Sequence, residues 1–142
     1  MTTSLKLSWS DALSTGNRAI DVQHKYLIDI INELAELIES GQSPKKIKTI
    51  LNLLQYYTEW HFHREELCME RYRCTVADFN KTAHQQFIDT FLWFQKEYAA
   101  SGGDQELALR MYKQLTDWLV NHIQRVDGQI SPCMAAERAD SD

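Results

Sequence analysis

Apolar side chains recur along most of the chain at intervals of three and four residues, the period of one face of an α-helix. Four such stretches follow one another. They run from about 20 to 40, from 43 through at least 68, from 75 to the Ser-Gly-Gly at 101–103, and from about 104 towards 132. Helices of this length joined by short loops pack side by side, so the sequence predicts an all-α fold, an antiparallel up-down four-helix bundle.

Two of the expected helix starts carry capping signals. Ser43 followed by Pro44 combines a favourable N-cap with proline in the first turn. Thr75 and Asp78 form a variant of the capping box, which predicts a helix beginning at Thr75. Residues 1–20 lack a sustained period and predict an extended arm. We expect one domain over residues 1–131, with 132–142 as a polar tail or the start of a linker.

Composition excludes several classes of protein. The chain has 142 residues and a net charge of −5, which argues against nucleic acid or an anionic membrane as partner. It has no run of about 20 apolar residues and no signal peptide, so we expect a cytoplasmic protein. The three cysteines, Cys68, Cys74 and Cys133, predict reduced thiols, with Cys68 a small core residue and no partner for the other two.

Polar side chains occupy positions on the apolar faces where the bundle should bury hydrocarbon. They are His24, His61, Glu65, Asn80, His84 and His122. A single buried histidine is usually a hydrogen-bonded core residue, but a buried carboxylate among four histidines is stabilised only if a cation collects them. Imidazole and carboxylate together suit iron, manganese or zinc, and spacing alone leaves that choice open.

Short motifs in a fixed order give the chain a resemblance to a known family. They are "IDVQH" at 20–24, "HFHREE" at 61–66, "AHQQF" at 83–87, "WLVNHI" at 118–123 and an aspartate five residues after His122, preceded by "LSWSDALSTGNRAID". In this order and at these separations they resemble the bacterial hemerythrins over nearly the whole chain. The resemblance implies two iron ions in an oxo- or hydroxo-bridged non-haem centre, with O2 as ligand.

The resemblance also assigns roles to individual residues. Its implied metal ligands are His24 and His61 on the iron that binds O2, His84 and His122 on the other iron, and Glu65 and Asp127 as bridging carboxylates. Its implied O2 pocket consists of Leu27, Phe62, Trp118, Leu119 and Ile123. In a regular helix Asp127 would point about 140° away from His122, so a local widening of the helix is needed there. Within "EWHFHREELCME" we expect His61 and Glu65 to face inward, and Glu59, His63, Glu66 and Glu70 to be solvated.

The sequence departs from the family pattern at Asn80, where the family places a histidine. Asn80 is then a weak ligand or holds a water, each iron keeps two histidines, and both irons have an exchangeable position. We therefore expect ready autoxidation between diferrous and diferric states, which suits an oxygen or redox sensor better than an oxygen carrier. We expect a sensor domain and not an enzyme. The alternatives are an oxygen carrier or storage protein, a di-iron enzyme reducing O2, peroxide or nitric oxide, and a metal-free bundle. By resemblance, the partner would be a C-terminal signalling output domain.

Overall fold

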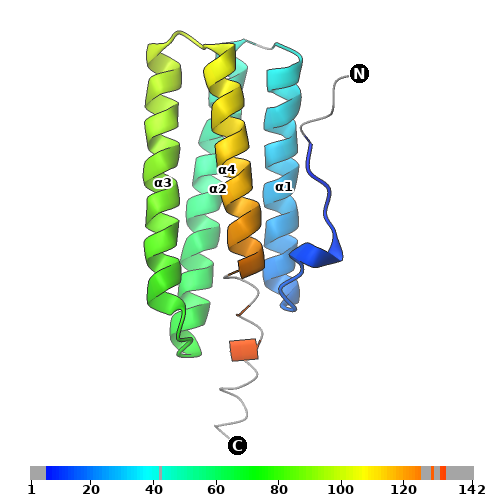
Figure 1. Cartoon of the computed structure of the whole chain (residues 1–142), viewed down its shortest axis with the longest axis vertical. Coiled ribbons are helices and arrows are strands. Elements are labelled where there is room, and N and C mark those ends of the chain that lie inside the picture. The colour runs from blue at the N-terminus through cyan, green and yellow to red at the C-terminus, as the bar shows by residue number, and fades with distance from the viewer. Residues whose placement is uncertain (1–5, 42, 126–128, 130–131, 134–142) are drawn as a thin grey trace, which may run out of the picture.

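The protein is a bundle of four long helices (Figure 1), seen in a computed structural model that describes residues 6–41, 43–125, 129 and 132–133. A short 3-10 helix, η1 (Asp11–Leu13), precedes the long helices. These are α1 (Arg18–Glu39), α2 (Pro44–Arg71), α3 (Ala77–Ala100) and α4 (Gln105–Arg125). Each helix packs against its neighbour in sequence, and α1 also packs against α4. The predicted all-α, up-down bundle is confirmed.

The helix starts differ in part from those predicted. Helix α1 begins two residues early because the Asn17 side chain accepts a hydrogen bond from the Ile20 amide at 3.1 Å. Helix α2 begins at Pro44 as expected. The prediction that a capping box starts the third helix at Thr75 was wrong. Helix α3 begins at Ala77, and its N-cap residue, Val76, makes no side-chain capping bond.

A tight turn after α2 is what displaces the start of α3. Arg73 takes a left-handed conformation with φ of 53°. The Cys74 amide donates to the Met69 carbonyl, and the Arg73 amide donates to the Glu70 carbonyl. These bonds form a Schellman motif, which satisfies the last carbonyls of α2 and turns the chain sharply. Cys74 is thereby buried, with 6% of its surface exposed.

The N-terminal arm is non-helical over residues 6–10 and 14–17, but it contains η1, and residues 18–20, which were predicted to belong to it, are part of α1. The Asn32 side chain of α1 accepts a hydrogen bond from the Leu7 amide at 2.7 Å and donates one to the Leu7 carbonyl at 2.9 Å. Further along, Asp21 accepts bonds from the backbone and hydroxyl of Thr15 and from the Ser14 hydroxyl. Burial alone would raise the pKa of Asp21, but these bonds lower it. The arm is therefore fastened along α1.

Two apolar clusters fill the bundle. The larger runs through the interior and includes Leu27, Phe62 and Leu119. The smaller lies where α1 begins and α2 ends, and is built on Ile20, Met69 and Cys74. Among the described ranges no helix is both long and apolar enough to cross a membrane. The expected continuation of the fourth helix to Pro132 lies mostly outside the described residues.

The prediction that all three cysteines are reduced was wrong. Cys74 and Cys133 form a disulfide with a Cα–Cα distance of 5.7 Å, and Cys68 is the described cysteine that is not in a disulfide. The two bonded residues are 59 positions apart, and only the packing of the bundle brings them together. Cys133, which the sequence assigned to the polar tail, is thus covalently attached to the bundle.

Candidate metal centre

Five of the six predicted metal ligands lie together inside the bundle. All four long helices contribute: His24 from α1, His61 and Glu65 from α2, His84 from α3 and His122 from α4. None of the five exposes more than 6% of its surface. Asp127, the sixth, lies outside the described residues. Helical spacing explains the convergence, because each residue occupies the inward face of its helix.

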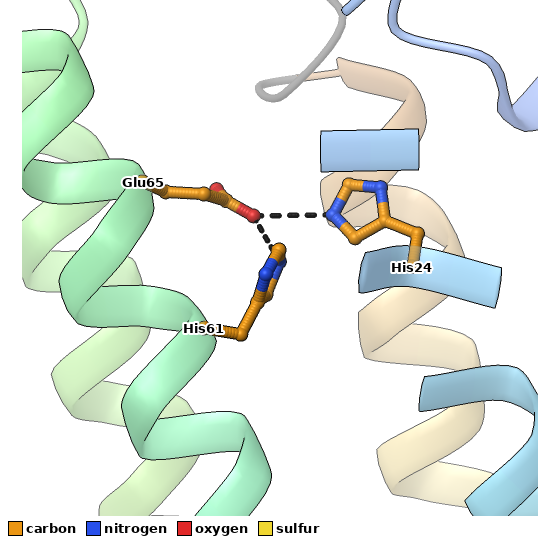
Figure 2. A group of neighbouring side chains, drawn as sticks. All are labelled: His24, His61 and Glu65. Atoms are coloured by element: carbon orange, nitrogen blue, oxygen red, sulfur yellow. Dashed lines mark hydrogen bonds and ion pairs between the residues drawn. The ribbon is translucent and has the colours of Figure 1, made fainter. Parts of the chain in front are cut away.

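Glu65 stands between two pairs of histidines. Its Oε1 atom is 3.1 Å from His24 Nε2 and also contacts His61 Nε2 (Figure 2). Its other oxygen, Oε2, is 3.7 Å from His84 Nε2. The Nε2 atoms of His84 and His122 are in turn 3.1 Å apart. The carboxylate therefore presents a different oxygen to each histidine pair.

The ligand atoms form two groups that share this carboxylate. One consists of His24, His61 and Glu65, the other of Glu65, His84 and His122, and within each group the atoms lie within 4.8 Å of one another. Two adjacent metal positions joined by a carboxylate are what this arrangement provides. The pairing of the histidines is the one that the resemblance implied.

Burial keeps the second histidine pair neutral. Desolvation lowers the pKa of His84 to about 3, although the Glu65 charge acts in the opposite direction. Desolvation likewise lowers the pKa of His122 to about 4. A neutral imidazole has a nitrogen lone pair for a metal, whereas an imidazolium has none. At neutral pH both side chains are thus in their metal-binding form.

Gln23 has a role that sequence reasoning missed. Its side-chain oxygen accepts a hydrogen bond from His61 Nδ1 at 2.6 Å. With its proton on Nδ1, His61 directs the Nε2 lone pair at Glu65 and the metal position. The signal was within the "IDVQH" motif, since the residue before a ligand on one helix can support a ligand on the next. Gln23 is therefore a positioning residue.

Asn80 is buried, and its side-chain amide group contacts the sulfur of Met69. It exposes 0% of its surface, and its Nδ2 atom donates to Met69 Sδ at 3.1 Å. Its Oδ1 atom is buried and has no hydrogen-bond partner among the described residues. An unsatisfied buried amide oxygen costs on the order of 1–3 kcal/mol. A water or a cation near Oδ1 would remove that cost, so the side chain fits the predicted role of weak ligand or water holder.

Two aromatic rings lie flat against the second histidine pair. Phe62 stacks on His84 with ring centroids 3.7 Å apart and planes 3° from parallel. Trp118 stacks on His122 at 4.5 Å and 13°. The other residues of the predicted O2 pocket, Leu27, Leu119 and Ile123, are buried in the same apolar cluster. These side chains keep bulk water from the centre.

One side of the centre faces an open groove. A cavity of about 670 Å³ between α2 and α3 has His84 and Phe62 in its lining, together with Lys81 and Glu66. Glu59, His63 and Glu70 are exposed, as predicted for this stretch. Glu66 is instead partly buried, and burial raises its pKa. The groove reaches the outer side of the His84 ring, which exposes only 2% of its surface.

The donor set fits a pair of metal ions. A buried carboxylate and four buried imidazoles are stabilised together when cations bind them. Within the part of the chain that the structure describes, the Nδ1 atom of His84 and Oδ1 of Asn80 are buried without hydrogen-bond partners, so each could be satisfied by a bound water or ion. Mixed nitrogen and oxygen donors are the ligands of iron, manganese and zinc.

Known proteins share both the sequence pattern and the fold. The family model described as "Hemerythrin HHE cation binding domain" matches residues 15–134. A bacteriohemerythrin of Methylococcus capsulatus is 32% identical over 133 residues, which cover 92% of this chain and 98% of the relative. A bacteriohemerythrin of Pseudomonas aeruginosa is 31% identical over 121 residues, covering 85% and 76%. The crystal structure of a wild-type hemerythrin has a TM-score of 0.80 at 28% identity, covering 90% of this chain and 97% of that one.

Proposed function

The chain belongs to the hemerythrin family, whose domain binds a di-iron centre and dioxygen, and on that premise we propose that it is an oxygen and redox sensor. In this proposal the centre passes readily from the diferrous to the diferric state. The change of oxidation state, rather than stored oxygen, is the output. We place the protein in the cytoplasm, with O2 as its small-molecule partner.

The chain's own residues define how the two irons would be held. His24 and His61 would hold one iron, His84 and His122 the other, and Glu65 both. When bound, the iron pair supplies two one-electron changes of oxidation state and the position at which O2 binds. Glu65 offsets part of the positive charge in a medium of low dielectric constant. Gln23 keeps His61 in the tautomer that faces the centre.

The observation that carries the sensor proposal is Asn80. The family pattern has a histidine at this position, but the Asn80 amide group is engaged with Met69 and its oxygen is a weaker donor than imidazole. The second iron would then have two histidines and an exchangeable position. Access of a small ligand to that iron would speed oxidation, and the groove that has His84 in its lining is where we propose such a ligand approaches.

The test follows the reaction of the anaerobic, iron-loaded protein with oxygen. We expect about two irons per chain on the basis of the two ligand groups. Mixing with air-saturated buffer should give the diferric spectrum without a long-lived oxygen-loaded form. An oxygen-loaded form that lasts for minutes or longer would instead identify an oxygen carrier and contradict the sensor proposal.

A second candidate is an enzyme that reduces O2, peroxide or nitric oxide. The feature that favours it is the groove, because an enzyme needs repeated access of substrate to the centre. The two candidates are separated by adding an electron donor with excess peroxide or nitric oxide. Many turnovers per di-iron centre indicate the enzyme, whereas a single turnover per centre indicates the sensor.

A sensor needs a partner that reads its state. We propose a signalling output domain joined to the C-terminal side of the bundle. Support comes from the disulfide, which holds the chain beyond α4 at the end of the bundle where α2 stops and α3 starts. Sequencing the gene beyond the codon for residue 142 tests this directly, and a stop codon there would exclude a fused output.

A further inference from the structure

The Cys74–Cys133 disulfide lies at the ligand end of the bundle, defined here as the end where α2 stops and α3 begins. Cys74 occupies the turn between those two helices, three residues before α3. Cys133 follows the last residue of α4, Arg125, by eight positions in sequence. The bond therefore fastens the chain beyond α4 to the α2–α3 turn.

The bond is part of the packing that surrounds Asn80. Cys74 belongs to the cluster of Ile20 and Met69, and Cys133 packs against the same cluster. Met69 exposes 0% of its surface and accepts the hydrogen bond from Asn80 at 3.1 Å. Met69 thus belongs to the disulfide cluster and also contacts Asn80.

The two bonded cysteines differ in exposure. Cys74 is buried, whereas Cys133 is partly exposed, and its Sγ lies 3.7 Å from the Tyr72 carbonyl. Thiol–disulfide exchange requires an attacking thiolate to reach one sulfur in line with the bond. Attack is therefore directed at Cys133, with Cys74 as the leaving group.

We propose that this disulfide is a reversible, redox-controlled clamp that attaches the chain beyond α4 to the ligand end of the bundle. In the opening step, the thiolate of a low-molecular-weight thiol bonds to Cys133 Sγ, the Cys74–Cys133 bond breaks, and Cys74 leaves as a thiolate that takes up a proton. A second such thiol then releases Cys133 as a thiol. Two thiols become one small-molecule disulfide, and two electrons and two protons reach the protein. Closure is the reverse of these steps.

The clamp goes beyond the sensor function proposed above and does not require it. Its chemistry is that of sulfur, so it operates whether the iron centre carries, senses or reduces oxygen. It makes the attachment of any C-terminal partner depend on the thiol–disulfide balance. The predicted ligand Asp127 falls in sequence between Arg125 and Cys133, so retention of iron is a second quantity that clamp opening should change.

The third cysteine provides a matched control. Among the described residues Cys68 is not part of a disulfide, and it is partly buried and packed against the same cluster. Burial raises the pKa of its thiol, and the Glu65 charge adds to that effect. A protonated thiol is a poor nucleophile, so Cys68 should not displace either member of the bonded pair.

The experiment equilibrates the full chain in glutathione buffers that range from fully reduced to fully oxidised. Free thiols are then alkylated, and the linked peptides are identified by mass spectrometry. We expect a Cys74–Cys133 linkage that forms and opens reversibly in the wild type and in Cys68→Ser, and that is absent from Cys133→Ser. Cleavage by trypsin after Arg125 should be several-fold faster in the reduced wild type and in Cys133→Ser than in the oxidised wild type.

Three results would overturn the clamp. One is the absence of the linkage at every glutathione ratio. Another is a linkage that joins Cys68 instead. The third is a linkage that opens while both the rate of cleavage after Arg125 and the retention of iron stay unchanged. Because the reduced wild type carries no substitution, it shows the effect of opening even if Cys133→Ser folds poorly. None of these readouts depends on oxygen reactivity, so failure of the clamp is distinguishable from failure of the sensor proposal.

Discussion

At the scale of single residues, the centre depends on how one carboxylate divides its contacts. Glu65 Oε1 faces His24 and His61, while Oε2 faces His84. Its neighbour Glu66 has the same side-chain chemistry but lines the outer groove. Two adjacent residues of α2 therefore have different environments: Glu65 belongs to both ligand groups, whereas Glu66 is partly exposed in the groove.

Replacing Glu65 with glutamine should remove most of the bound iron. The neutral amide keeps the size of the side chain but loses the charge that offsets two cations, and an amide is a poor bridge. We expect the affinity for iron to fall at least about tenfold, as it does when a residue that supports a metal site is lost. The measurement is iron per chain after gel filtration, which should fall as a result. Glu66→Gln is the matched control and should retain its iron. Equal iron content in the two variants would contradict the shared-ligand role of Glu65.

Replacing Asn80 with histidine should slow autoxidation. By the resemblance, the imidazole would match the family pattern and would fill the position on the second iron that we propose is exchangeable. The measurement is the rate at which the diferrous protein becomes diferric in air, compared with the wild type. Met69→Leu serves as a control, because it removes the sulfur that Asn80 contacts without adding a ligand. If Asn80→His and the wild type oxidise at the same rate, the missing histidine does not control the redox behaviour.

At the scale of elements, the helix ends decide how the ligands are presented. Helix α1 starts with a side-chain cap from Asn17, seven residues before His24. Helix α2 starts with proline and no side-chain cap. Helix α3 follows a Schellman turn, which also delivers Cys74 to its disulfide. The helix starts therefore differ in how much a single N-cap side chain contributes to stability.

The contrast between α1 and α2 predicts unequal effects of removing an N-cap side chain. Asn17→Ala should lower the free energy of unfolding by about 1 kcal/mol, because the Ile20 amide loses its acceptor. Ser43→Ala should cost less than about 0.5 kcal/mol, because the Ser43 side chain makes no capping bond. Urea denaturation of both variants in the same metal state measures the difference. Equal losses would show that the Asn17 bond does not stabilise α1.

At the scale of the whole molecule, a polar centre occupies part of the core of a small bundle. Five buried titratable side chains stand where hydrocarbon would otherwise pack. Metal binding compensates for their desolvation, so binding free energy becomes folding free energy. The apolar cluster around Phe62, Leu27 and Leu119 supplies the remaining stability of that region.

Acid should destabilise the metal-free protein in a defined range of pH. The pKa of His84 is about 3 and that of His122 about 4 in the folded state, against 6.5 for an ordinary histidine. Between pH 6.5 and about 4 the unfolded chain therefore binds more protons, and the free energy of unfolding falls as the pH falls. The slope from each histidine is at most about 1.4 kcal/mol per pH unit.

Denaturation in urea with a chelator, at several pH values from 7 to 5, measures this slope. Ordinary carboxylates titrate mainly below that range, so the slope there reports mainly on histidines, and removal of His84 and His122 isolates the share of that pair. A variant with His84→Gln and His122→Gln should have a flatter profile than the wild type. A wild-type profile that is already flat from pH 7 to 5 would contradict the neutral, buried state of the pair.

The sequence by itself determined the four helices, their inward faces and the family. Spacing of three and four residues fixes which side chains share a face of a helix, so His61 and Glu65 could be placed together without a structure. The ordered motifs over nearly the whole chain then identified the residues of the other helices that face His61 and Glu65. The departure at Asn80 was equally visible, because it is a change of residue type at a fixed position.

Only the tertiary structure decided the contacts between helices. The division of the Glu65 oxygens, the bond from His61 to Gln23 and the turn of Asn80 towards Met69 all depend on how far apart two helices pack. The sequence failed at Cys74 and Cys133, since 59 residues separate them and no local pattern records that distance. Periodicity specifies the direction of a side chain within its own helix, whereas the partner it meets is set by the packing of the whole bundle.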